Sequence, residues 1–138
     1  MTVIQSSIRI KSTVDIIWNI VSDLDNEPKF WKGTKEIRNI SMEENKVTRE
    51  ITIAFKDSKC MQEVVLEPKK IIQAKFTKGI IEGTKTIELI PVDDTTEVEV
   101  TWDIKLSGLM GMFTGMIKKH IKNGTEQALE SIKQEAER

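Results

Sequence analysis

The last stretch of the chain, GLMGMFTGMIKKHIKNGTEQALESIKQEAER (residues 108–138), decides the fold. At about 100° per residue, its apolar side chains fall on one side of a helix and most of its charged side chains on the other. The residues on the apolar side are Leu109, Phe113, Met116, Ile117, His120, Ile121, Ala128 and Ile132. A stripe this long must be covered by a concave partner. The sequence therefore predicts one long amphipathic helix over 108–138 that packs into a curved sheet.

The partner is expected between Lys35 and Leu106, where strands and turns alternate. Turn-forming residues recur there about every ten residues, the spacing of an antiparallel meander. The clearest strand comes last, and its inward residues are Val98, Val100, Trp102, Ile104 and Leu106. A strand over 47–55 has the same alternation, broken only by Arg49. One face of the sheet is therefore predicted to be buried and the other to face water.

One strand and two short helices are predicted before the meander. The first strand is expected over 3–11. Ser12 and Asp15 resemble a capping box, with Ser12 as the N-cap of a helix that ends near Ser22. Pro28 suits the first turn of a second helix. The order of elements predicts an α+β fold, in which a seven-stranded curved antiparallel sheet surrounds a long C-terminal helix.

Length and composition exclude several classes of protein. The 138 residues are enough for one domain, residues 1–138. Lys plus Arg (21) nearly balance Asp plus Glu (22), and the net charge of −1 argues against nucleic acid as the main partner. The one cysteine, Cys60, excludes an internal disulfide. No stretch has the length of a signal-peptide core or a membrane span, so a cytoplasmic location is expected. No metal-ligand cluster or phosphate loop is present, so neither a metal nor a cofactor is expected.

Three local motifs resemble those of a known superfamily. They are the stretches STVDIIW at 12–18, DLDNEPKFW at 23–31 and GLMG at 108–111. Together with the order of elements, they resemble the START-like helix-grip superfamily (SRPBCC), which includes polyketide cyclases/dehydrases and coenzyme-Q-binding proteins. The resemblance implies a cavity between sheet and last helix that binds lipids, polyketides, quinones or other hydrophobic molecules. Glu27 departs from the pattern, because many members have an aromatic residue before the proline.

Two polar residues interrupt the apolar faces that should line such a cavity. His120, the one histidine, could hydrogen-bond a ligand carbonyl or act as a general base. The alternative is a histidine at the cavity edge, satisfied by water or a backbone carbonyl. Arg49 could anchor a carboxylate or phenolate. Its alternatives are a bulge that returns it to solvent or an internal salt bridge to a glutamate.

The expected lining of the cavity combines these two residues with inward apolar positions. The candidate ligand-binding residues are Arg49, Ile53, Phe55, Trp102, Ile104, Phe113, Met116, Ile117 and His120. The best-supported function is the binding or carriage of a small hydrophobic molecule. An enzyme of the cyclase/dehydrase type, with His120 moving a proton, is the first alternative. The sequence lacks tyrosine, a frequent acid in cyclase pockets, which disfavours catalysis.

A third function follows from the composition at the start of the last helix. Gly108, Gly111 and Gly115 alternate there with methionines, and such a segment suits an adaptable apolar surface. It could open the cavity, or dock transiently on a membrane or a partner protein. The alternative is ordinary close packing against the strands. The oligomeric state, the identity of the ligand and a break in the helix near Asn123–Gly124 are left open by the sequence.

Overall fold

The computed structural model describes residues 2–138, with the side chains of Leu109 and Met110 excepted. Strands and helices follow one another in the order predicted. The strands are β1 (Thr2–Ile10), β2 (Thr34–Glu43), β3 (Lys46–Ile53), β4 (Lys59–Glu67), β5 (Ile71–Lys78), β6 (Ile81–Val92) and β7 (Thr95–Leu106). The helices are α1 (Val14–Val21), α2 (Glu27–Phe30) and α3 (Thr114–Ala136), with 3-10 turns η1 (Leu24–Asn26), η2 (Phe55–Asp57) and η3 (Gly108–Phe113).

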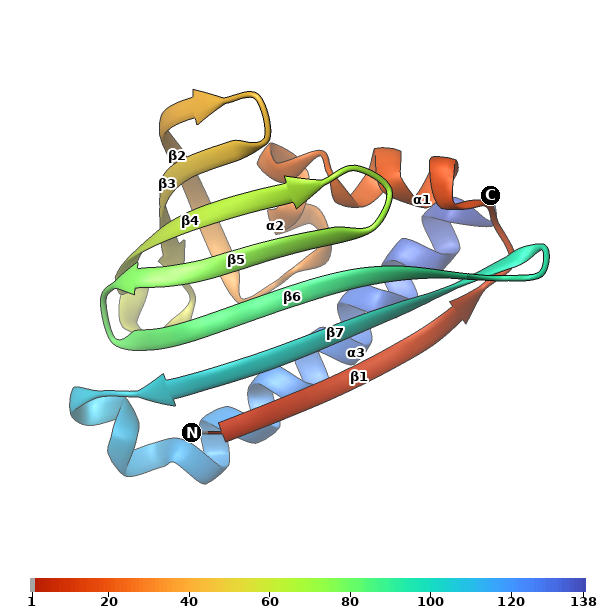
Figure 1. The fold of residues 1–138 in the computed structure, drawn as a ribbon. Coiled ribbons are helices and arrows are strands. Elements are labelled where there is room, and N and C mark those ends of the chain that lie inside the picture. The colour runs from red at the N-terminus through yellow and green to blue at the C-terminus, as the bar shows by residue number, and fades with distance from the viewer. Residues whose placement is uncertain (1) are drawn as a thin grey trace.

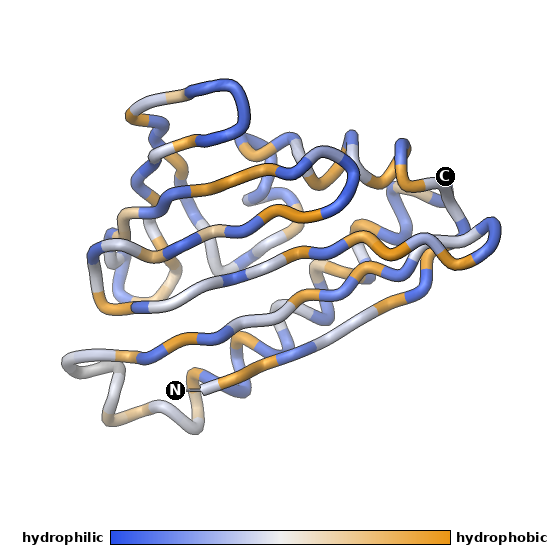
Figure 2. The backbone as a smooth tube through the Cα atoms, in the orientation of Figure 1, coloured by the Kyte–Doolittle hydropathy of each residue, from blue (hydrophilic) through white to orange (hydrophobic). Residues whose placement is uncertain are grey.

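The strands form one antiparallel sheet that curves around α3 (Figure 1). Its order across the described residues is β1-β7-β6-β5-β4-β3-β2, so the first strand of the chain pairs with the last. The predicted seven-stranded sheet, the C-terminal helix and the short helices after β1 are therefore confirmed. Figure 2 shows the alternation of apolar and polar residues along β7 that supports this arrangement. None of the described helices is long and apolar enough to cross a membrane.

The N-cap of α1 is Thr13 and not Ser12 as predicted. The Thr13 side chain accepts a hydrogen bond from the backbone N–H of Ile16 at 3.4 Å. Ser12 is buried, and its carbonyl accepts a hydrogen bond of 2.9 Å from the Thr96 hydroxyl. Asp15 forms an exposed ion pair with Lys69 and does not complete a capping box. Ser12 thus attaches the end of β1 to the start of β7.

The long helix begins six residues later than predicted, at Thr114. Gly108 has a φ of +61°, which is incompatible with a right-handed helix, and residues 108–113 form the 3-10 turn η3. Figure 1 shows this turn passing beyond the end of β7. Met112, Phe113 and Met116 are 77%, 44% and 53% exposed, so they do not pack in the sheet. The side chain of Leu109, which also belongs to the predicted apolar stripe, lies outside the described residues.

The core is divided into two groups of buried residues along α3. The larger group packs the C-terminal half of α3, around Ala128, Leu129 and Ile132, against the sheet, α1 and α2. The smaller group lies around Ile104 and Ile117, near the beginning of α3. Trp102 packs against both groups. The middle of α3, between the two groups, is where the helix and the sheet leave space.

Candidate functional site

A cavity of about 530 Å³ occupies the space beside the middle of α3. This volume is within the range of about 300–1,000 Å³ that is typical of small-molecule sites. Its walls come from α2, from the strands β3 to β7 and from one side of α3. Most of the wall is apolar, and the apolar lining includes Ile51, Ile53, Phe55, Phe76, Ile81 and Ile121. The cavity can therefore accept an apolar molecule.

Six of the nine candidate residues lie in the wall of this cavity. They are Arg49, Ile53, Phe55, Trp102, Ile117 and His120. Ile104 faces inward as expected but is 1% exposed, because it packs within the smaller core group and not against the free space. Phe113 and Met116 lie outside the wall, because the chain has left the sheet where α3 begins.

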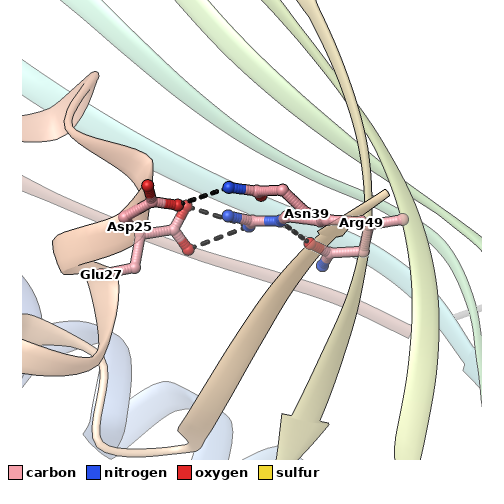
Figure 3. Close-up of polar contacts among 5 residues, drawn as sticks. Asp25, Glu27, Asn39 and Arg49 are labelled. Atoms are coloured by element: carbon pink, nitrogen blue, oxygen red, sulfur yellow. Dashed lines mark hydrogen bonds and ion pairs between the residues drawn. The ribbon is translucent and has the colours of Figure 1, made fainter. Parts of the chain in front are cut away.

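Arg49 forms the polar end of the cavity together with two partners. The side chain is 2% exposed. Its Nε donates to Oε1 of Gln62 at 2.9 Å, and its Nη2 donates to both carboxylate oxygens of Glu27 at 2.9 and 3.0 Å (Figure 3). Its Nη1 is buried without a hydrogen-bond partner among the described residues. Of the arrangements considered for Arg49, the structure shows the internal salt bridge to a glutamate, Glu27. Arg49 nevertheless lines the cavity.

The ion pair with Arg49 accounts for the acidic residue at position 27, where the superfamily pattern differs. It stands before Pro28 at the start of α2, where many members have an aromatic residue, and its side chain is 13% exposed. A nearly buried carboxylate needs a partner, and Arg49 supplies it. The neighbouring Asn39 donates to Asp25 at 2.8 Å, so a second polar contact joins this segment to β2 (Figure 3). The two contacts hold α2 over the end of the cavity.

Lys85 is the functional candidate that the sequence analysis missed. It lies on β6, is 7% exposed and lines the cavity. Its Nζ is 3.2 Å from the centroid of the Trp31 ring and 5.1 Å from that of Trp102. Among the described residues, no carboxylate or hydrogen-bond acceptor lies within bonding distance of this nitrogen. The sequence pattern could have indicated Lys85, because it has the same alternation parity on β6 as Ile81 and Ile87, which are buried.

The surroundings of Lys85 both lower and raise the pKa of its ammonium group. Burial lowers the pKa of Lys85 to about 8, and the nearby Glu27 carboxylate partly opposes that shift while Arg49 adds to it. The face of an aromatic ring attracts an ammonium ion, so Trp31 also favours the charged form. At neutral pH the cavity therefore contains an ammonium group without a carboxylate in contact.

Trp102 is held in one orientation by α3. Its Nε1 donates to the Thr125 hydroxyl at 3.0 Å, and that hydroxyl donates to the carbonyl of Ile121 at 2.7 Å. The ring packs beside Phe76 and edge-on to Trp31, with centroids 6.3 Å apart in each case. This hydrogen bond fixes the distance between the helix and β7, and so the width of the cavity.

The surroundings of His120 and Cys60 do not favour a catalytic role for either side chain. His120 is exposed and lines the cavity, so it lies at the opening. Cys60 is buried in the smaller core group, and burial raises the pKa of its thiol, which disfavours the nucleophilic thiolate. The described residues contain no group of three or more histidine, cysteine, aspartate or glutamate side chains arranged to hold a metal ion.

A long helix enclosed by a curved antiparallel sheet, with a cavity between them, is the helix-grip fold of START-like proteins. The chain belongs to the family of polyketide cyclase / dehydrase and lipid transport proteins, whose pattern it matches over residues 1–137. No curated protein matches the sequence.

Solved structures show the same fold at low sequence identity. A protein from Thermus thermophilus superposes with a TM-score of 0.83 at 13% identity, over 98% of this chain and 97% of that one. Zhui aromatase/cyclase from Streptomyces sp. R1128 gives 0.80 at 12% identity, over 99% and 94%. A START superfamily protein from Mycobacterium smegmatis gives 0.69 at 14% identity, over 94% and 98%. These similarities establish the fold.

Proposed function

We propose that the chain binds or carries a small hydrophobic molecule, of lipid, quinone or polyketide type, in the cavity beside α3. The observation that supports this most directly is the mostly apolar cavity of about 530 Å³, whose wall includes the buried polar side chains of Arg49, Gln62 and Lys85. Apolar walls favour burial of an apolar ligand, at about 25 cal/mol per Å² removed from water. Convergent polar groups give such a ligand its orientation. Membership of a family of cyclases and lipid carriers supports the same function.

Gly124 offers a way to fill the cavity without disturbing the backbone. It lies on α3 and lines the cavity, and a Cβ placed there meets nothing within 4 Å. We expect Gly124→Leu to lower the affinity for a neutral apolar dye, N-phenyl-1-naphthylamine, by at least about tenfold, because the new side chain occupies ligand volume. Dye titration, with tryptophan fluorescence as a second signal, measures this effect.

Gly115 provides the matched control for this substitution. It also lies on α3 with open space around its Cβ, but it is outside the wall of the cavity. Gly115→Leu should bind the dye like the unmodified protein. Trp18→Phe should preserve the fluorescence response, because Trp18 packs against the larger core group and Trp31 and Trp102 remain at the cavity. Equal binding by both glycine variants would show that the dye does not use this cavity.

His120 distinguishes binding from catalysis of the cyclase/dehydrase type. Because it lies exposed at the opening, we expect His120→Gln to keep most of the ligand affinity and His120→Ala to lose at most about three- to tenfold, the value of one neutral hydrogen bond. A general base would behave differently, since its removal lowers turnover by about 10²–10⁴-fold and glutamine does not rescue it. Turnover of an aromatic-polyketide substrate that collapses in His120→Ala and His120→Gln alike would favour the enzyme.

A further inference from the structure

The charges at the inner end of the cavity do not balance. Both oxygens of Glu27 are engaged by Nη2 of Arg49, so the carboxylate and the guanidinium neutralise each other. Lys85 contributes one further positive charge. The other ionisable groups in the wall, Lys32 and His120, are exposed at the opening and supply no negative charge. The buried end of the cavity therefore has a net positive charge when it is empty.

The contacts of Lys85 leave its ammonium group available to a ligand. The strands on either side present Ala74 on β5 and Trp102 on β7 opposite Lys85, and neither side chain has a charge. The group rests on the Trp31 ring, which compensates for only part of the lost hydration. The small exposed fraction of Lys85 faces the cavity, because β6 is an inner strand and its partners cover it on both sides.

From this imbalance we propose that the ligand is a hydrophobic acid, whose carboxylate pairs with Lys85 and the Arg49–Glu27 group at the inner end while its apolar body lies along the wall. This inference rests on the proposed binding function and specifies the chemical class of the ligand. A carboxylate supplies the counter-charge that Lys85 lacks, and ammonium–carboxylate hydrogen bonds are roughly twice as strong as neutral ones. The Nη1 of Arg49, buried without a partner among the described residues, offers the carboxylate a hydrogen-bond donor at the same end. The apolar body would contact Ile51, Phe76 and Ile81.

The test compares an acid with its ester in displacement of N-phenyl-1-naphthylamine. Decanoic acid and methyl decanoate have the same chain and differ in charge. At neutral pH we expect the acid to bind at least about tenfold more tightly than the ester. The Lys85→Met variant should lose this preference for the acid and keep its affinity for the ester. Lys75→Met is the matched control, because Lys75 lies on the adjacent strand β5 and is exposed to solvent. Its preference for the acid should be unchanged.

The pH dependence of the affinity for the acid tests the same proposal on the unmodified protein. In the free protein, Lys85 loses its proton as the pH rises through about 8, while decanoic acid is already ionised. The affinity for the acid should therefore be constant between about pH 6 and 8, where the acid is ionised and Lys85 is protonated. It should fall above that range by up to about tenfold per pH unit, and the affinity for the ester should stay flat. In Lys85→Met the acid should also show a flat profile.

The outcomes separate this inference from the proposed function. Equal affinities for acid and ester in the unmodified protein, or a preference that survives Lys85→Met, would overturn the acid assignment and leave hydrophobic binding intact. If the dye, the acid and the ester all fail to bind, the proposed function itself is wrong. Lys85→Met replaces a buried charge by an apolar side chain of similar length, so its melting temperature should match or exceed that of the unmodified protein.

Discussion

Arg49→Ala should destabilise the folded protein by about 3–5 kcal/mol. The substitution leaves the carboxylate of Glu27, which is 13% exposed, without its counter-ion, and it removes the donor to the buried Gln62. An uncompensated charge in such a place costs far more than the net value of the pair that has been broken. Urea unfolding at neutral pH, followed by tryptophan fluorescence, gives the change in free energy.

Two further variants distinguish a buried charge effect from a general loss of packing. Arg49→Met combined with Glu27→Leu should recover most of the lost stability, because it replaces both charges by apolar groups. Arg38→Ala breaks the exposed pair between Arg38 and Glu50, and it should cost no more than about 1 kcal/mol. A value for Arg49→Ala as small as that for Arg38→Ala would mean that Glu27 finds other partners or water.

Gly83→Ala should cost about 3–5 kcal/mol, although it adds a single methyl group. A Cβ at Gly83 would lie 2.1 Å from the carbonyl oxygen of Asp103 and 2.9 Å from the Cα of Ile104. Both atoms belong to the backbone of β7, which pairs with β6 at this position and cannot move aside locally. The φ of +118° at Gly83 adds strain for any residue with a side chain. Thermal and urea unfolding measure the loss.

The control for Gly83 is a glycine on a helix. Gly115→Ala places a methyl group in open space on α3, where alanine is the better helix former by up to about 1 kcal/mol, so this variant should be at least as stable as the unmodified protein. If the two alanine variants proved equally stable, the close approach of β6 and β7 at Gly83 would have to relax easily. The ladder geometry argues against that result.

The fold could be predicted because its signals are local and repeated. Alternation in β7 and the turn residues between strands identify the meander, and one amphipathic stripe identifies α3. The same reasoning found Arg49 as a polar residue on an inward strand face. It could have found Lys85 in the same way, because both residues interrupt buried apolar positions. Polar residues on inward faces were the most useful indication of the site.

The remaining differences depend on three-dimensional geometry that a pattern does not contain. Alternation places Ile104 and Trp102 on the same inward face, but only the packing decides which of them borders free space. The helical stripe continues through Phe113 and Met116, yet the positive φ of Gly108 and the 3-10 turn after it delay the helix until the chain has passed the sheet. Pairings across the chain, such as that of Glu27 with Arg49, are also absent from local periodicity.

The pairing of β1 with β7 has a consequence for synthesis of the protein. Thr2 lies opposite Ile104 and Ile10 opposite Thr96, so β1 has no partner in this sheet until β7 has been synthesised. At about 5–20 residues per second, that interval lasts roughly 5–20 s. During it, Ile4 and Ile10, which are buried in the finished sheet, remain open to chaperones and proteases. Contacts this distant in sequence also slow folding. β1 therefore cannot pair with the rest of the sheet before β7 has been made. If synthesis stops before β7, β1 stays unpaired.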